Sequence, residues 1–227
     1  NDKDDPNTNE EAMAALRINV KSKDKELVGR LFSAKIIELA LSNYPGFFAG
    51  GGVKSGGPVL IYWPALVDSK HINEVVHFNG KSKELKPTSQ LNFEEIYYQT
   101  EPVKIPDAPK GETSHVPLGT LFGARSGDKG GCANLGVWAK DLDAFAFLSS
   151  FLTIEKLKEL MPDLKEFKIE RFDLPNILSL NFYIHDILED GVSSNSRKDA
   201  QAKSLGEYLR AKKANIPSSL LETLNEY

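Results

Sequence analysis

A proline-rich segment near the middle of the chain divides it into two halves. Residues 101–115, EPVKIPDAPKGETSH, contain three prolines and almost no apolar periodicity. Proline fixes φ and lacks a backbone donor, so such a segment suits neither a helix interior nor a central strand. We predict a linker at 101–115, between a small domain at residues 13–100 and a second at 116–212. Residues 1–12 are predicted as a flexible leader and residues 213–227 as a C-terminal tail.

Apolar periodicity predicts the elements of the first half. Alternation over Ala15–Lys21 predicts a strand, and apolar residues at every third or fourth position from Lys25 predict a helix to about Ser42. Val59–Tyr62 is predicted as a strand. A hairpin is expected over Asn73–Leu85, because Asn79-Gly80 tolerates the positive φ angles of a tight turn.

The second half mixes strand and helix patterns, which predicts an α+β fold of two small α/β sandwich domains for the whole chain. Residues 177–188 fit both the period of a strand and that of a helix, and that choice stays open. The other predicted elements are strands at 116–124, 132–138 and 167–173, two short helices within 142–161, and a closing helix at 197–212.

Composition excludes several classes of function. The formal net charge of −4 argues against broad binding to nucleic acid or to anionic membranes. No apolar run is long enough to form a membrane helix. The single cysteine, Cys132, forms no intramolecular disulfide, and no Cys/His cluster has zinc spacing, so we expect a cytoplasmic protein without a metal site. The sequence indicates no particular cofactor.

The segment Gly123–Asn134, GARSGDKGGCAN, has the highest density of functional chemistry. Its glycines, among them Gly127 and Gly130, allow consecutive N–H groups to converge, while Arg125 and Lys129 supply positive charge and Ser126 a hydroxyl. We predict an anion-binding loop here, with Asp128 as a candidate acid or base. The alternative is a tight strand connection whose charges pair or lie in water. Neither a Walker A loop nor a GxGxxG helix opening is present.

A second polar group follows in the chain. His185 lies in an apolar segment, where it is either a general base near neutral pH or a histidine with a structural partner. Asn181 between two apolar neighbours must find hydrogen-bond partners or cost about 1–3 kcal/mol, so it fixes a neighbouring segment or contacts a ligand. Cys132 has no base nearby in the sequence and is predicted as a packed thiol.

Two stretches of sequence resemble one known family. GARSGDKGGCANLGVWA at 123–139 and FDLPNILSLNFYIHDILEDGVSSNSRKDAQAKSLGEYL at 172–209 are similar to the C-terminal ferredoxin-like domain of the acyclic terpene utilisation protein A (AtuA) family. The motifs YPGFF and YWPALV of the first half resemble the end of the larger core domain of that family. The resemblance implies a ferredoxin-like second domain, preceded at 13–100 by the C-terminal part of an AtuA-like core.

The resemblance also implies a function. AtuA-like proteins are linked to the breakdown of acyclic terpenoid and branched acyl-CoA or carboxylate compounds, with no assigned reaction. The positions that match the family motifs are Arg125, Ser126, Asp128, Lys129, Asn134, Asn176, Asn181 and Arg197. Gly131-Cys132 departs from the usual acidic and polar pair, which argues against a metal or acid role there.

Two hypotheses follow from these residues. In the first, the chain is the C-terminal portion of a catabolic enzyme that binds a small anionic metabolite or an acyl-CoA, with Asp128 or His185 transferring protons. In the second, it is a non-catalytic assembly or ligand-binding module that docks a larger core chain. The glycine-rich motifs at the start of the family's core have no counterpart here, so we expect the rest of the core as a separate chain or a missing segment. We also expect a homo-oligomer.

Overall fold

A computed structural model describes residues 7–9, 11–41, 45, 47–48, 56–85 and 102–222. The predicted leader is therefore described only in part, and residues 86–101 lie outside the described residues. The fold is α+β, as predicted, and the chain divides into two compact units, residues 1–59 and 60–227.

The described part of the first unit contains two helices. Helix α1 spans Lys25–Val28 and α2 spans Arg30–Leu41, so the helix expected from Lys25 to Ser42 is interrupted at Gly29, whose ψ of −129° is not helical. Asp24 caps α1 by accepting a hydrogen bond from Glu26 N at 2.9 Å. The predicted strand at Ala15–Lys21 is wrong: these residues are exposed, and no described strand pairs with them.

The second unit contains the predicted hairpin. Strands β1 (Glu74–Phe78) and β2 (Lys81–Leu85) pair antiparallel, and Asn79 and Gly80 form the turn with φ angles of 47° and 72°. A short 3₁₀ helix, η1 (Ser69–His71), precedes them. The strand predicted at Val59–Tyr62 is not formed, since none of the described strands pairs with this segment.

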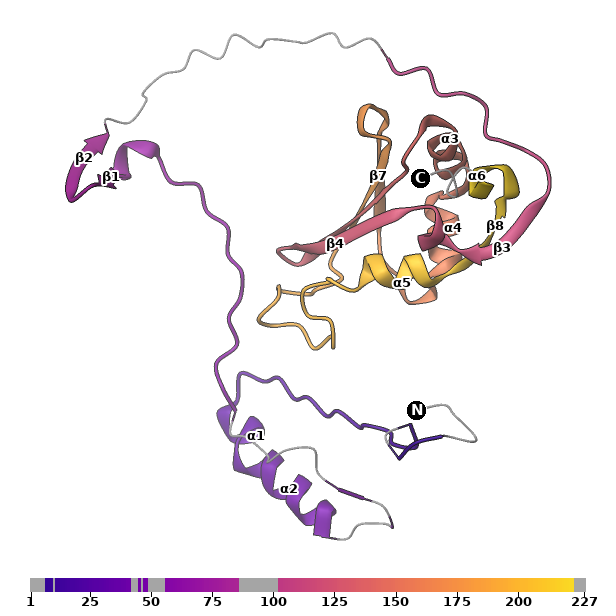
Figure 1. Cartoon of the computed structure of the whole chain (residues 1–227). Helices are drawn as coiled ribbons and strands as arrows, with labels where there is room; N and C mark the ends of the chain where they lie inside the picture. Colours follow the sequence, from indigo (N-terminus) through magenta and orange to yellow (C-terminus); the bar gives the residue numbers. More distant parts are fainter. Residues whose placement is uncertain are drawn as a thin grey trace. The chain divides into compact units, whose positions relative to one another are not determined.

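A four-stranded antiparallel sheet organises the C-terminal half (Figure 1). Its spatial order is β4-β5-β7-β6, with β4 at Gly123–Lys129, β5 at Cys132–Trp138, β6 at Ile169–Leu174 and β7 at Ser179–Ile184. The ambiguous segment 177–188 is thus mainly strand. The loop predicted within Gly123–Asn134, between the strands expected at 116–124 and 132–138, is wrong. Strand β4 pairs with β5 up to Lys129↔Cys132, and only Gly130 and Gly131 remain for the turn.

One face of this sheet forms the hydrophobic core with α3 (Leu142–Phe151) and α4 (Ile154–Leu160). The two helices predicted within 142–161 are therefore confirmed. Asp141 caps α3 through Ala144 N at 2.8 Å, and Thr153 caps α4 through Lys156 N at 3.1 Å. The largest fully buried side chains include Leu135, Phe145, Leu157, Leu180 and Phe182.

A second, two-stranded sheet joins both ends of this domain. Strand β3 (Thr113–Pro117) pairs antiparallel with β8 (Lys213–Pro217), and α6 (Ser218–Glu222) follows. The segment predicted as a tail therefore contains a strand and a helix, and buries Ala214, Ile216 and Leu220.

Two further differences from the predictions concern element boundaries. The strand expected at 116–124 is interrupted by the 3₁₀ helix η2 (Leu118–Thr120). The closing helix expected at 197–212 is shorter, since α5 spans Leu205–Ala211. The remaining 3₁₀ helices, η3 (Pro162–Leu164) and η4 (Pro175–Ile177), each begin at a proline.

No helix in the described ranges has the length and apolar character needed to cross a bilayer.

Candidate functional site

The face of the four-stranded sheet opposite the core carries polar side chains and three exposed apolar ones, Trp138, Phe172 and Leu174. Successive residues of a strand point to opposite faces, and the register fixes which residues share a face. Apart from Gly127, none of these residues is buried. We define this open face by the following residues: Arg125, Gly127 and Lys129 of β4, Cys132, Asn134, Gly136 and Trp138 of β5, Ser179, Asn181 and Tyr183 of β7, Glu170, Phe172 and Leu174 of β6, and His185 directly after β7.

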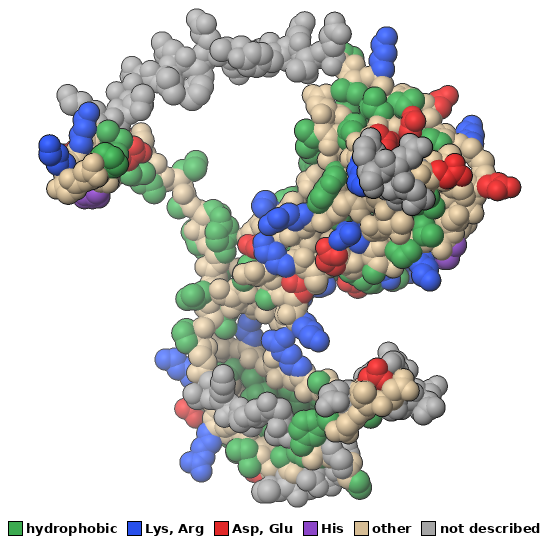
Figure 2. Space-filling view, in the orientation of Figure 1, with side chains coloured by type: hydrophobic (Ala, Val, Ile, Leu, Met, Phe, Trp, Pro, Cys, Tyr) green, Lys and Arg blue, Asp and Glu red, His purple; other side chains and the backbone are tan. Residues whose placement is uncertain are grey.

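A basic cavity of about 270 Å³ lies along β4. Arg125, Lys129 and Lys203 line it together with Asn134. Lys203 lies over Gly127, where a Cβ atom would come within 3.1 Å of Lys203 Nζ. Figure 2 shows Lys and Arg side chains gathered over the end of β4. The cavity therefore combines three positive side chains with one carboxamide and one acidic residue, Asp128.

The positive charges of the cavity are only partly compensated. Lys129 Nζ donates to the backbone oxygen of Asp128 at 3.2 Å. Within the described ranges, neither Arg125 nor Lys203 has a carboxylate partner. Unpaired cations that converge on one hollow favour an anion as the missing partner.

Asp199 fixes the backbone that carries Lys203. Its carboxylate accepts hydrogen bonds from Lys203 N at 2.9 Å and from Ser204 N at 2.8 Å. Burial opposes ionisation of Asp199, but these hydrogen bonds and that of the Ser204 hydroxyl outweigh it and lower the pKa. Asp199 is therefore the residue that holds Lys203 at the cavity.

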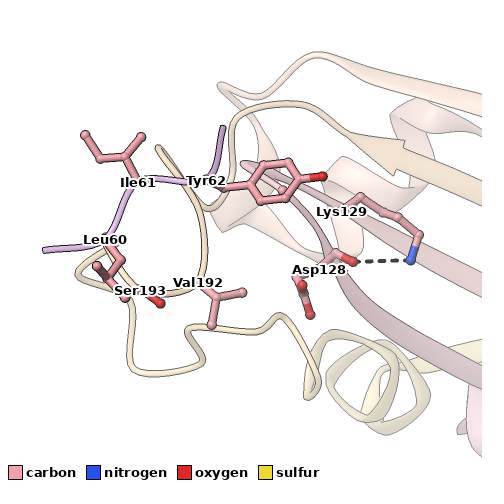
Figure 3. A pocket seen from close by; sticks show the side chains of 8 residues that line it. Leu60, Ile61, Tyr62, Asp128, Lys129, Val192 and Ser193 are labelled. Atoms are coloured by element: carbon pink, nitrogen blue, oxygen red, sulfur yellow. Dashed lines mark hydrogen bonds between the residues drawn. The ribbon is translucent and has the colours of Figure 1, made fainter. Parts of the chain in front are cut away.

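Two other residues of the predicted loop also line this cavity and have further neighbours. The Ser126 hydroxyl is buried and accepts a hydrogen bond from Gly206 N at 3.0 Å, so it joins β4 to α5. Asp128 lines a second cavity of about 420 Å³, shared with Lys129, Gly130, Tyr62, Leu60 and Val192. Figure 3 shows Tyr62 extending toward Asp128 and Lys129 from the segment 60–62.

Tyr62 fits against two glycines. Its backbone N donates to Asp190 O at 3.3 Å. A Cβ atom at Gly130 would approach the Tyr62 ring to 3.1 Å, and one at Gly191 would approach Tyr62 Cβ to 3.3 Å. Gly130 also has a φ of 66°, which favours glycine. Gly130 thus forms the turn and leaves room for the Tyr62 ring.

Asn181 has its partner on the open face. Asn134 Nδ2 donates to Asn181 Oδ1 at 3.4 Å, so the carboxamide that looked anomalous in an apolar run lies on the polar side of β7. This contact leaves the Asn134 carboxamide beside the basic cavity, where it is a candidate ligand-binding group.

His185 belongs to a titratable cluster at the other side of the open face. His185 Nε2 lies 2.8 Å from Glu170 Oε1, and Lys168 Nζ lies 2.9 Å from the same oxygen. Lys168, and then His185, lower the pKa of Glu170. The Tyr183 ring contacts the His185 ring edge-on at 4.9 Å between centroids. A hydrogen bond with the Cys132 thiol, and then burial, raise the pKa of Tyr183.

The structure does not bring the two predicted proton-transfer residues together. Asp128 pairs with Ala133, which pairs with Ile184. By alternation His185, one residue further, lies on the opposite face from Asp128. Two predicted ligand-binding residues also lie elsewhere: Asn176 is in η4, and Arg197 pairs with Asp163 at 3.5 Å.

Sequence reasoning missed three residues of the open face and its cavity: Lys203, Tyr183 and Glu170. Lys203 ends the pattern D-x-Q-x-K at residues 199–203, inside the stretch 172–209 that resembles the family, and this pattern was the signal that could have indicated it. Tyr183 and Glu170 are found only once β6 and β7 are in register. No cluster of three or more His, Cys, Asp or Glu side chains suited to a metal ion occurs among the residues that the structure describes.

Two family models match the sequence. The model described as the AtuA ferredoxin-like domain matches residues 116–215, which contain the four-stranded sheet. The model described as acyclic terpene utilisation family protein AtuA matches residues 1–78. No curated protein and no solved structure shows significant similarity to the chain.

Proposed function

Because the chain belongs to the AtuA family, we propose that its ferredoxin-like domain binds the anionic group of a small carboxylate or an acyl-CoA. The protein then acts in the breakdown of acyclic terpenoid or branched acyl compounds, as an enzyme or a component of one. One observation carries this proposal: Arg125, Lys129 and Lys203 line a single cavity in which Arg125 and Lys203 have no described carboxylate partner.

The surroundings of the cavity suit a carboxylate or phosphate. Arg125 can offer a planar pair of donors and Lys203 a point charge, while the Asn134 carboxamide adds a neutral donor. Gly127 leaves room for the Lys203 side chain to lie over the strand. The second cavity shares Asp128 and Lys129 with the first, and its Leu60, Ile61 and Val192 offer an apolar wall for the remainder of a ligand.

A thermal-shift series tests this function. The probes are butanoyl-CoA, free CoA and glutarate, each added to the wild-type chain and to the variants Arg125→Ala, Lys203→Ala and Lys213→Ala. A ligand present at 100 times its Kd adds about 2.7 kcal/mol of stability. We expect a shift for the wild type and for Lys213→Ala, whose lysine is exposed on β8. The shift should be smaller for Arg125→Ala and Lys203→Ala, and equal shifts in all four proteins would contradict the proposal.

A second candidate function is assembly with a further polypeptide. The described residues up to Leu85 include no buried side chain, and the hairpin exposes Val75, Val76 and Phe78. A lone two-stranded hairpin is marginally stable in water, so a covering partner would stabilise it. The rest of the core region, or a second copy of this chain, would fit that role.

Native mass spectrometry of the purified protein distinguishes these assemblies. Co-purification of a second polypeptide supports a split core, and a multiple of the chain's own mass supports a homo-oligomer. A monomer at all accessible concentrations would contradict both.

We place the protein in the cytoplasm on the basis of its single thiol, Cys132.

A further inference from the structure

We propose that Tyr183, His185 and Glu170 form an acid–base site for a carbonyl compound whose anionic group is held in the basic cavity. This inference rests on the proposed function, because it uses the cavity as the anchor of the same ligand. It adds a reaction class, which is proton transfer at the carbon next to a carbonyl group.

The contact with Glu170 determines the protonation pattern of His185. An ionised carboxylate can only accept, so the 2.8 Å contact between Glu170 Oε1 and His185 Nε2 requires the proton on Nε2. In the neutral imidazole, Nδ1 then carries the lone pair. In the described part of the chain, no group donates a hydrogen bond to His185 Nδ1. Glu170 is thus a positioning residue, and Nδ1 is the candidate base.

Tyr183 supplies the complementary donor. It lies two residues before His185 on the same face of β7, with the rings 4.9 Å apart in an edge contact. Its pKa is raised by the Cys132 thiol and by burial, so the phenol keeps its proton at neutral pH. A neutral phenol beside a base is the arrangement that stabilises the oxygen of a forming enolate.

The register sets the spacing between the acid–base group and the basic cavity. Gly127, under Lys203, pairs with Asn134, and Asn134 pairs with Tyr183. Two strand spacings separate β4 from β7, which is about 10 Å. A ligand that uses both sites therefore lies across β5 and carries its anion and its carbonyl roughly 8–10 Å apart.

The proposed step is balanced and redox-neutral. His185 Nδ1 accepts a proton from the carbon next to the carbonyl, and the electron pair of that C–H bond forms the new C=C bond. The π electrons of the carbonyl move to its oxygen, which accepts a hydrogen bond from the Tyr183 hydroxyl. The reverse step returns a proton, and in D₂O it returns a deuteron.

Hydrogen–deuterium exchange tests this step. The probe is 7-oxooctanoate, a linear oxo acid of suitable length, incubated with the full chain in D₂O while proton NMR follows the signals next to the ketone. 2-Octanone, which lacks the carboxylate, is the comparison probe. The variants are His185→Ala, Tyr183→Phe and Glu170→Gln. The controls are His115→Ala on β3 and Tyr208→Phe on α5, both outside the open face.

The expected result is exchange of 7-oxooctanoate faster than in buffer and faster than exchange of 2-octanone. General acid–base groups contribute typically 10²–10⁴-fold, so His185→Ala should slow the exchange at least about tenfold, with both controls unchanged. Glu170→Gln should slow it less, because an amide can still accept from Nε2. Urea unfolding of each variant shows whether a slower exchange comes from a loss of folded protein.

Two results would overturn the inference in different ways. If 7-oxooctanoate binds with an affinity that Arg125→Ala weakens, but exchanges no faster than in buffer, the acid–base site is refuted and the anion site stands. If neither 7-oxooctanoate nor the CoA and dicarboxylate probes bind at all, the proposed function fails together with this inference.

Discussion

Gly127 and Gly131 flank the end of β4, yet a methyl group at each would meet a different kind of neighbour. At Gly127 the added Cβ lies 3.1 Å from Lys203 Nζ, the far end of a flexible side chain. Gly127→Ala should therefore change the free energy of unfolding by less than about 1 kcal/mol. It should weaken binding of glutarate or butanoyl-CoA, because Lys203 must move away. Urea unfolding and calorimetric titration measure the two effects, and an unchanged affinity would refute the placement of Lys203.

Gly131→Ala is the matched comparison. Its added Cβ would run into the backbone oxygen of Glu189, which cannot swing aside as a lysine side chain can. We expect a loss of about 2 kcal/mol or more in unfolding free energy. A variant as stable as the wild type would contradict this expectation, because the Gly130–Gly131 turn would then move away from the Glu189 oxygen at no cost in stability.

The ionised Asp199 carboxylate should make the stability of the fold depend on pH in the acidic range. Hydrogen bonds from Ser204 and Lys203 lower its pKa below the ordinary 3.8, despite the opposing effect of burial. A carboxyl group with a lowered folded-state pKa contributes stability above its unfolded-state pKa, and that contribution is lost as the pH falls through the folded-state value. Asp199→Asn should therefore be less stable than the wild type near neutral pH, with the gap narrowing below about pH 4.

Urea unfolding of both proteins at several pH values between about 7 and 3 measures this gap. A gap that stays constant over the whole range would show that the Asp199 charge does not contribute. The same variant should also bind anions more weakly, since Asp199 holds the backbone N–H of Lys203.

At the scale of elements, Ser126 joins the edge strand to α5. Its buried hydroxyl accepts from Gly206 N at 3.0 Å, and Gly206 packs against the backbone of Ala124 and Arg125. Ser126→Ala leaves a buried N–H without its acceptor, which costs about 1–3 kcal/mol. The exposed Ser150→Ala on α3 is the control and should change stability by less than about 0.5 kcal/mol. Equal losses in the two variants, measured by urea unfolding, would contradict this role of Ser126.

Local patterns predicted the elements whose signals are local. The Asn79-Gly80 turn and the two short helices within 142–161 depend on neighbouring residues, and both predictions are confirmed. Strand β4 was predicted as a loop because its glycines and charges are typical of loops. Backbone pairing with β5 stabilises a strand in spite of this composition. That pairing involves another segment of the chain, so residues 123–129 alone do not predict it.

In the candidate site, too, local patterns predicted some residues and long-range contacts determine the others. The motif at 123–134 contains Arg125, Lys129 and Asn134, which the structure brings to one cavity. Lys203 comes from a segment predicted as helix, where Asp199 instead caps a turn and Ala202 has a φ of 53°. Tyr183 and Glu170 meet His185 only through the β6–β7 register, which no local pattern specifies.

At the scale of the whole molecule, the two ends of the chain differ in how much they bury. The buried apolar residues of the described ranges all lie between Leu118 and Leu220. We therefore expect residues 102–227, produced alone, to unfold in one cooperative transition, because that segment contains its own core. Residues 1–100 alone should show no cooperative transition by circular dichroism. Cooperative unfolding of the 1–100 fragment would contradict this division.

The central claim is that the basic cavity binds an anion, and calorimetric titration of butanoyl-CoA tests it most directly. Wild type, the Arg125→Ala/Lys203→Ala double variant and Lys213→Ala are compared in the same buffer. Hydrogen bonds to charged groups contribute about 1.5–3 kcal/mol each, so the double variant should bind at least about tenfold more weakly, while Lys213→Ala matches the wild type. Equal affinities in all three proteins, or no heat of binding in the wild type, would contradict the account.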